Sequence, residues 1–238
     1  MDKWYEVPGK AGTNVIYSRV RLVRNLKEYP FPGRLTKEQS AELSEKLLGG
    51  LTGIASMDRM QYRFTHLERM GDLEKTALLE RRAINRSVMK KKDPTGMILS
   101  EDESTAILLN GDDHVRIQTL QTGLTLEQLY ERADKIDDYI SERFDYAFDE
   151  KYGYLTSFPT NVGTGLRAAV VLHLPMLSKN KNFNSLVADM GRFGTQVRGV
   201  YGEGAENFGS LYQISNQKTL GQTEREIIDI VREAALEL

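Results

Sequence analysis

The chain contains seven short runs of β-forming residues, and these runs do not alternate regularly with helices. They lie at 15–22, 61–66, 105–109, 114–120, 168–174, 195–201 and 211–215. A parallel sheet needs a crossover connection, usually a helix, between successive strands, whereas antiparallel strands can be joined by short turns. The pattern therefore predicts an α+β fold with a mainly antiparallel sheet.

The clearest hairpin of the predicted sheet runs from Thr105 to Leu120. Its loop, Asn110-Gly111-Asp112-Asp113, contains an Asn-Gly turn signal. A second loop is expected at Lys90 to Pro94, with its three lysines exposed to solvent.

Three helices are predicted from capping boxes, in which a threonine and a glutamate or glutamine three residues later satisfy each other's backbone amides. The pairs are Thr36 with Gln39, Thr125 with Gln128, and Thr223 with Glu226. The first helix is expected to end at Gly49-Gly50. The second carries an apolar stripe from Leu126 to Phe144, and the third runs to the end of the chain.

Composition excludes several classes of protein. The 238 residues include no cysteine, so disulfides, cysteine-ligated zinc, iron-sulfur clusters and thiol nucleophiles are ruled out. The formal net charge of -2 argues against a general binder of nucleic acid or of anionic membranes. Without a long apolar segment or a signal-peptide core, we expect a cytoplasmic protein, and without a domain boundary we expect one domain over 1–238.

Arginines alternate along several predicted strands. Arg19 and Arg21 are two residues apart and so share a face, as do His114, Arg116 and Gln118, while Arg198 alternates with apolar neighbours. If these strands are adjacent, their guanidinium groups repel one another unless an anion lies among them, and a polyphosphate is a good match for guanidinium geometry. Solvent-facing polarity is an equally good interpretation at this point, because any one-sided sheet alternates in this way.

Two other features fit an anion site. The segment from Pro159 to Arg167 is rich in glycine and hydroxyl groups, although it is no Walker loop and by itself indicates only a turn. Carboxylates occur in two glycine-containing loops, Asp112 and Asp113 in one, Glu203 and Glu206 in the other. Loop carboxylates are most often solvated, but beside a phosphate site they could hold a cationic substrate for phosphoryl transfer.

The order of these motifs resembles that of the ATP:guanido phosphotransferases, and within them the bacterial protein-arginine kinases. The resemblance covers nearly the whole chain. It is carried by the segments 18–25, 110–116, 153–164, 198–203 and 212–217 with Leu220-Gly221. It implies a large antiparallel sheet flanked by helices, with an active site for Mg-ATP on the sheet face.

The resemblance also implies roles for individual residues. Those expected to contact the nucleotide are Tyr17, Ser18, Arg19, Val20, Arg21, Arg82, Arg116, Arg167, Ala168, Ala169, Val170, Val171, Arg198, Gly199, Val200, Tyr201 and Gly202. Glu203 is expected to be the base that removes the guanidinium proton and Asp112 the carboxylate that orients the guanidinium. Phe158 and His114 are expected in the substrate pocket, and no protein ligand to a metal is predicted.

Two residues depart from the family pattern. Asp112 stands where the family usually has a glutamate, so the carboxylate is one methylene shorter. Phe158 stands where relatives carry a cysteine whose thiolate lies against the substrate guanidinium. Phenylalanine cannot ionise; it can offer a cation-π face or block the pocket.

Three functions remain in competition. The first is an ATP-dependent kinase for arginine residues exposed in proteins, the second a kinase for a free guanidino metabolite such as arginine, and the third a nucleotide-binding pseudokinase or regulatory adaptor. The resemblance adds a zinc-binding activator protein, a transcriptional repressor and a Clp-type unfoldase as possible partners, without nucleic acid or membrane.

The two ends of the chain carry a last expectation. The small N-terminal helical domain of animal phosphagen kinases and the C-terminal region of longer protein-arginine kinases are both expected to be absent. The chain is thus either a fragment or a short family member.

Overall fold

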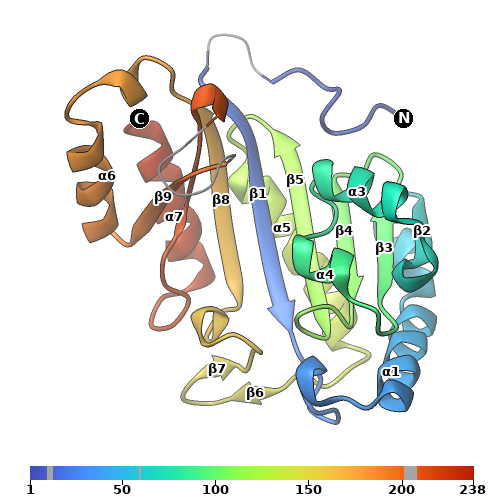
Figure 1. The fold of residues 1–238 in the computed structure, drawn as a ribbon. Helices are drawn as coiled ribbons and strands as arrows, with labels where there is room; N and C mark the ends of the chain where they lie inside the picture. Colours follow the sequence, from blue (N-terminus) through green and yellow to red (C-terminus); the bar gives the residue numbers. More distant parts are fainter. Residues whose placement is uncertain (10–12, 59, 201–207) are drawn as a thin grey trace.

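The computed structural model describes residues 1–9, 13–58, 60–200 and 208–238. Within them the main sheet has eight antiparallel strands in the order β2-β3-β4-β5-β1-β8-β10-β9 (Figure 1). A two-stranded ribbon, β6-β7, lies below it. The strands are β1 Val15–Arg24, β2 Tyr62–His66, β3 Gly96–Ser100, β4 Thr105–Leu109, β5 Val115–Thr122, β6 Phe148–Asp149, β7 Gly153–Tyr154, β8 Leu166–His173, β9 Thr195–Gly199 and β10 Leu211–Asn216.

Helices lie on both faces of the sheet, but unequally. The α-helices are α1 Lys37–Gly50, α2 Ala55–Asp58, α3 Asp72–Glu80, α4 Arg86–Lys90, α5 Leu126–Ser141, α6 Phe183–Arg192 and α7 Glu224–Leu236. Helices α1, α5 and α7 cover one face, and α6 packs against the edge strand β9. On the opposite face, α3 and α4 lie in front of β3 and β4. Within the described ranges, the part of that face over β5, β1, β8, β10 and β9 has no helix on it.

The main core lies between the sheet and the covering helices α1, α5 and α7. Side chains of alternate strand positions, such as Val20, Ile117 and Val170, meet Leu129 and Ile228 there with no exposed surface. Burial of this kind stabilises the fold by roughly 25 cal/mol for each square ångström of apolar surface removed from water. The predicted α+β class and antiparallel sheet are confirmed.

The sequence-based elements are mostly found, with two corrections. The capping boxes at Thr36 and Thr223 form, but Thr125 makes no side-chain cap, and its backbone amide donates instead to the Ser18 hydroxyl at 3.1 Å. Helix α1 ends at Gly50, as the glycine pair predicts. Strand β3 was not predicted, because its residues are buried on both faces and lack the alternation of a half-exposed strand.

Candidate active site

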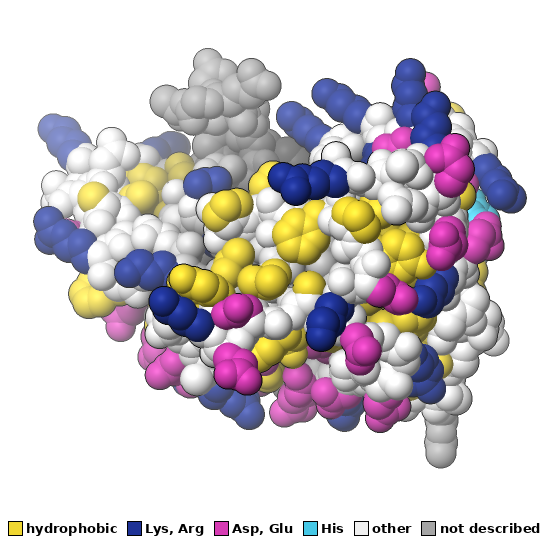
Figure 2. All heavy atoms as spheres, turned by 90° about the horizontal axis from the view of Figure 1, so that it is seen from below, with side chains coloured by type: hydrophobic (Ala, Val, Ile, Leu, Met, Phe, Trp, Pro, Cys, Tyr) yellow, Lys and Arg dark blue, Asp and Glu magenta, His cyan; other side chains and the backbone are white. Residues whose placement is uncertain are grey.

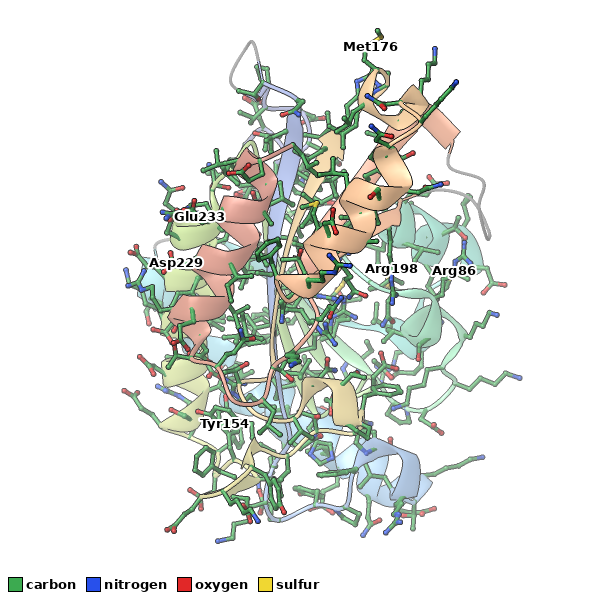
Figure 3. The ribbon with its side chains drawn as sticks, turned by 90° about the vertical axis from the view of Figure 1, so that its left-hand side faces the viewer. Arg86, Tyr154, Met176, Arg198, Asp229 and Glu233 are labelled. Atoms are coloured by element: carbon green, nitrogen blue, oxygen red, sulfur yellow. The ribbon has the colours of Figure 1, made fainter. Side chains whose placement is uncertain are left out.

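The strand arginines gather on the open face of the sheet. Arg19 and Arg21 project from the same face of β1, and Arg21 lies directly opposite Arg167 of β8. The register of the neighbouring strands places Arg116 of β5 and Arg198 of β9 on this face as well. In Figure 3, Arg198 lies on the side of the sheet that carries α4, away from Asp229 and Glu233 of α7. We call these five residues, Arg19, Arg21, Arg116, Arg167 and Arg198, the arginine face.

Three guanidinium groups of the arginine face, those of Arg19, Arg116 and Arg167, donate to neutral oxygens. None of the five forms an ion pair with a carboxylate within the described ranges. Their recorded hydrogen bonds run from Arg19 Nη2 to Gln213 Oε1 (2.8 Å), from Arg116 Nη2 to Gln118 Oε1 (3.0 Å), from Arg167 Nη1 to the Asn216 carbonyl (2.6 Å), from Arg167 Nη2 to the Thr160 carbonyl (2.9 Å), and from Arg167 Nε to Asn161 Oδ1 (3.3 Å).

This clustering makes the arginine face electrostatically unfavourable when it is empty. Among the described residues, the buried Nε atoms of Arg19, Arg21 and Arg116 have no hydrogen-bond partner. Burial, followed by repulsion from Arg19, Arg116 and Arg167, lowers the pKa of Arg21 well below its usual value. Burial and the charge of Arg19 likewise lower the pKa of Arg116 to about 10. An anion placed among these groups would supply the missing acceptors and counter-charge.

An apolar cluster borders one end of the arginine face. Trp4 packs edge-on against Tyr17, with ring centroids 5.3 Å apart, and both contact Leu120 and Val171. Val200 and Leu211 pack against the same group. The sequence pattern did not reveal Trp4, because this residue lies outside every predicted element.

Four of the residues expected at the nucleotide point away from it. Val20, Ala168 and Val170 have no exposed surface and lie in the main core beneath the helices. Ser18 is also on that side, where its hydroxyl donates to the Gly123 carbonyl at 2.7 Å. These positions alternate with Tyr17, Arg19, Arg21, Arg167, Ala169 and Val171, so the period of two excludes their side chains from the arginine face.

The two neighbouring aspartates of the β4–β5 loop have different environments. Asp112 is partly exposed, and its carboxylate accepts hydrogen bonds from Asn85 Nδ2 (2.8 Å) and from the Ser87 hydroxyl, both at the start of α4. Asp113 is 2% exposed and accepts from Asn25 Nδ2 and from the Ser157 amide, each at 2.7 Å. Asp113 is therefore a structural carboxylate, not a solvated one. It joins β1, the hairpin loop and the segment that carries Phe158.

His114 does not line an open pocket, contrary to the expectation from the sequence. Its side chain has no exposed surface; Nδ1 accepts from the Leu26 amide at 3.0 Å and Nε2 lies 3.0 Å from the Pro30 carbonyl. With Nδ1 accepting, Nε2 carries the proton and donates it to Pro30, so the ring is neutral. Burial lowers its pKa to about 4. The histidine anchors the chain that follows β1.

Phe158 does lie beside the arginine face. It is 51% exposed, and the residue before it is held by Asp113. The short turn after it, Pro159–Asn161, supplies two of the oxygens that hold Arg167. Phe158 therefore stands between the Asp112 loop and Arg167, where the resemblance places a substrate group.

The remaining predicted residues have mixed outcomes. Arg82 has a φ of +68°, its carbonyl accepts from Gln118 Nε2 at 2.6 Å, and its charge contributes to the lowered pKa of Arg19. Gly199 and Val200 are described, whereas Tyr201, Gly202, Glu203 and Glu206 lie outside the described residues.

One of the three lysines at 90–92 differs from the expectation that all are exposed to solvent. The ammonium of Lys91 donates instead to the carbonyls of Asn110 (2.7 Å) and Gly111 (2.9 Å).

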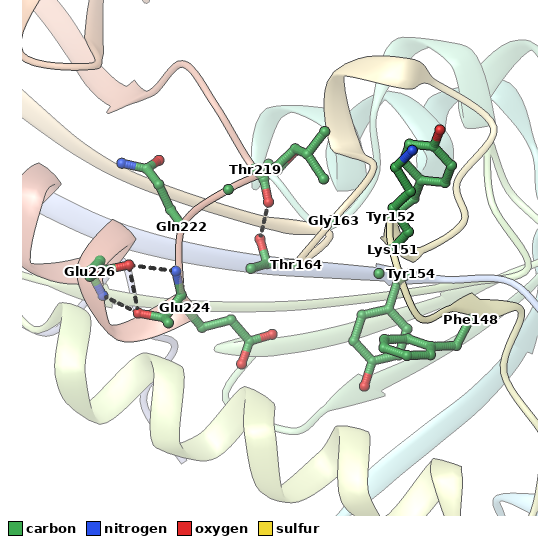
Figure 4. Close-up of a pocket in the computed structure, with 14 residues that line it drawn as sticks. Phe148, Lys151, Tyr152, Tyr154, Gly163, Thr164, Thr219, Gln222, Glu224 and Glu226 are labelled. Atoms are coloured by element: carbon green, nitrogen blue, oxygen red, sulfur yellow. Dashed lines mark hydrogen bonds between the residues drawn. The ribbon is translucent and has the colours of Figure 1, made fainter.

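A pocket of about 560 Å³ lies behind the loop that frames Arg167 (Figure 4). Its floor joins the 163–164 and 219–224 segments, where the Thr164 hydroxyl donates to the Thr219 carbonyl at 3.2 Å. Gly163 has a φ of +109°, and a Cβ there would lie 2.2 Å from the Thr219 oxygen, so only glycine allows this approach. Of the two carboxylates that line the pocket, Glu224 accepts from the Tyr130 hydroxyl at 2.7 Å and Glu226 accepts from the Thr223 amide at 2.7 Å. The pocket supports the loop and is separate from the arginine face.

Charge elsewhere on the surface is mixed. In the view from below, basic and acidic side chains are interspersed among hydrophobic ones (Figure 2). Within the described residues, no helix is both long enough and apolar enough to cross a membrane.

Comparison with known proteins agrees with this geometry. Residues 45–238 match the family profile described as ATP:guanido phosphotransferase, C-terminal catalytic domain. The chain is 39% identical to a protein-arginine kinase of Halothermothrix orenii over 96% of this chain and 64% of the relative. It is 40% identical to one of Bacillus velezensis over 100% of this chain and 65% of the relative. The chain thus spans slightly less than two thirds of the length of these curated relatives.

Solved structures share the fold. A lombricine kinase superposes with a TM-score of 0.82 at 24% identity, covering 94% of this chain and 64% of the other. A duplicated taurocyamine kinase from Schistosoma mansoni, with bound components of a transition-state analogue, has a TM-score of 0.82 at 27% identity, covering 93% of this chain and 32% of the other. From the sheet, the arginine face and the match over most of its length, the chain belongs to the ATP:guanido phosphotransferase family.

Proposed function

We propose that this chain is the catalytic domain of a protein-arginine kinase, which transfers the γ-phosphoryl group of ATP to the guanidinium of arginine residues in proteins. One observation carries the proposal: five arginines lie on one open sheet face without a carboxylate partner in the described residues, beside the Asp112 loop. The protein-arginine kinase relatives favour a protein substrate over a free one.

The arginine face fits a triphosphate. Three of its buried Nε atoms have no acceptor in the described part of the chain, and phosphate oxygens are suitable acceptors for such groups. Binding would relieve the repulsion that lowers the pKa of Arg21 and Arg116. Because phosphoryl transfer depends mainly on positioning and on charge stabilisation, a rigid set of strand-borne cations is well suited to it.

The described residues contain no group of three or more His, Cys, Asp or Glu side chains that could hold a metal ion. Mg²⁺ is commonly bound by substrate phosphates and water with few protein ligands, which suits this donor set. When bound, Mg²⁺ neutralises charge on the phosphates. Phosphate contacts would come from the chain's own Arg19, Arg21, Arg116, Arg167 and Arg198.

The carboxylates would act on the substrate guanidinium. A guanidinium has a pKa of roughly 12.5 to 13.8 and is a poor nucleophile while protonated. Asp112 would fix its plane and Glu203 would accept the proton as the nitrogen–phosphorus bond forms. The role of Glu203 rests on the family resemblance, since this residue lies outside the described part of the chain.

A second candidate function, a nucleotide-binding pseudokinase, is favoured by two residues. Phe158 cannot replace an ionisable cysteine, and the Asp112 carboxylate is already hydrogen-bonded by α4. The free guanidino substrates implied by the names of the lombricine and taurocyamine kinases are the third possibility. The zinc-binding activator, the repressor, the Clp-type unfoldase and a cytoplasmic location stay predictions of the resemblance and composition.

The proposal is tested by incubating the protein with Mg-ATP and either an unfolded protein or free arginine, and detecting acid-labile phosphoarginine by ³¹P NMR. We expect product on protein alone. Product on free arginine alone would support the metabolite kinase, and nucleotide binding without product would support the pseudokinase.

A Phe158→Cys variant extends this test. Since Phe158 is half-exposed, the substitution should cost little stability, and a thiolate beside the guanidinium should raise the rate of phosphotransfer. An Arg192→Gln variant, which changes an exposed arginine on α6, serves as the control. An unchanged rate in Phe158→Cys would show that the carboxylates suffice.

A further inference from the structure

The carboxylate of Asp112 is held by the first turn of helix α4. Asn85 caps this helix, accepting from the Val88 amide at 2.9 Å through Oδ1 and donating to Asp112 Oδ2 at 2.8 Å through Nδ2. The Ser87 hydroxyl donates to the other oxygen, Oδ1. Each carboxylate oxygen therefore has one donor from α4, and the orientation of the group is set by a helix.

The backbone of the same loop is held by the residue that ends α4. Lys91 donates from Nζ to the carbonyls of Asn110 (2.7 Å) and Gly111 (2.9 Å), the two residues that precede Asp112. Burial lowers the pKa of Lys91, while the charges of Asp93 and Asp112 oppose this effect. The long side chain of Lys91 is partly buried, and both of these hydrogen bonds go to the loop that carries Asp112.

These contacts leave Asp112 able to bind a substrate. A carboxylate has about four lone-pair positions, and α4 uses two of them. The charged groups around it are Lys91 at the end of α4, Arg116 on β5 and Asp113 in the same loop. Two donors on separate oxygens fix the plane of the carboxylate, and a fixed carboxylate is what orienting a guanidinium requires.

We propose that Ser87 and Lys91 are positioning residues for Asp112: Ser87 fixes the rotation of the carboxylate and Lys91 fixes the loop that carries it. The inference rests on the proposed function, in which Asp112 orients the substrate guanidinium. It also explains how an aspartate can serve where the family usually has a glutamate. The aspartate side chain is one methylene shorter, but the hydrogen bonds from the start of α4 hold its carboxylate in one position.

The test uses three variants of the full chain. Ser87→Ala removes the hydroxyl donor at an exposed helical position where alanine is favourable. Lys91→Met removes the ammonium but retains most of the stem. Lys90→Met, at the adjacent exposed lysine, is the matched control. Thermal unfolding of each variant confirms that the fold is intact, and Ser87→Thr, which restores a hydroxyl, tests for rescue.

Two measurements decide the outcome. The first is the NMR chemical shift of the Asp112 carboxyl carbon at neutral pH, which reports the hydrogen bonds to this group and needs no activity; we expect it to change in Ser87→Ala and Lys91→Met and not in Lys90→Met. The second is steady-state kinetics, in which kcat/KM for the arginine substrate should fall by about tenfold while the Kd for Mg-ATP is unchanged.

The possible failures can be separated. An unchanged Asp112 carboxyl chemical shift in both variants, or a higher kcat/KM in Ser87→Ala, overturns the positioning role. If the wild-type protein transfers no phosphate to any acceptor, the proposed function fails. The carboxyl chemical shift then still decides whether Ser87 and Lys91 hold the Asp112 carboxylate.

Discussion

Two arginines on strand β1, Arg24 and Arg21, show that a charged side chain can serve either stability or binding. Arg24 is 1% exposed, donates to Asp137 Oδ2 at 2.7 Å and 3.0 Å, and stacks 3.6 Å from the centroid of the Tyr154 ring. Burial acts to lower its pKa, but Asp137 and Tyr154 outweigh it and the pKa is raised. Arg21, three residues earlier, has Arg19, Arg116 and Arg167 as its close charged neighbours among the described residues.

This contrast predicts opposite effects of the same substitution. Arg24→Gln leaves Asp137 buried without its counter-charge and should destabilise the protein by about 3–5 kcal/mol. Arg21→Gln removes repulsion, so the melting temperature of the nucleotide-free protein should be unchanged or higher. The stabilisation by Mg-ATP should then fall, because the anion loses one of its arginines.

Calorimetry with and without Mg-ATP measures both effects. A loss of stability in Arg21→Gln as large as that in Arg24→Gln would contradict the conclusion that the arginine face is unfavourable when empty.

At the scale of elements, the sequence predicted correctly those helices that begin with a capping motif and those strands that have one polar face. Thr36 and Thr223 form the predicted capping boxes and begin α1 and α7. Thr125 fails because its amide bonds to Ser18, a partner 107 residues away that no local pattern can show. Helix α6 was missed because Asn182 makes no side-chain cap.

The two glycines at the end of α1 provide a matched pair of substitutions. A Cβ on Gly49 would meet nothing within 4 Å, whereas one on Gly50 would lie 2.4 Å from the Phe144 ring. Gly49→Ala should stabilise the protein by about 0.5–1 kcal/mol, since alanine is the better helix former. Gly50→Ala should destabilise it by about 1–3 kcal/mol through overpacking.

Chemical denaturation of the two variants gives the comparison directly. Equal effects at both positions would contradict the close approach of Gly50 to the Phe144 ring.

At the scale of the whole molecule, the two faces of the sheet carry different groups of side chains. The face under α1, α5 and α7 holds the main core, and the open face holds the arginines. At the lower ends of the strands, His114 connects the start of β5 to the chain that leaves β1 through its contacts with Leu26 and Pro30.

His114 predicts a dependence of stability on pH. Its pKa is about 4 in the folded protein and about 6.5 in the unfolded chain, so between these values the unfolded chain binds the additional proton. The free energy of unfolding should therefore decrease as pH falls from 6.5 to 4, by up to ~3 kcal/mol from this residue.

The measurement is urea unfolding across this range, together with NMR titration of the imidazole. His173→Gln, at an exposed histidine, should retain the full pH dependence. An imidazole of His114 that titrates near 6.5 in the folded protein would rule this explanation out.

The sequence by itself determined the α+β class, the hairpin around Asp112 and the face on which each strand arginine lies, because a strand has a period of two and this is a local property. Only the tertiary structure decided which arginines meet, since that depends on the order and register of strands far apart in the chain. It also decided that Asp113 and His114 are buried and hydrogen-bonded, and that Ser18 and Val20 face the core. Only the tertiary structure shows that Lys91 donates to the loop that carries Asp112. A side chain's partners are set by packing across the sheet, and packing brings together residues that no local pattern relates.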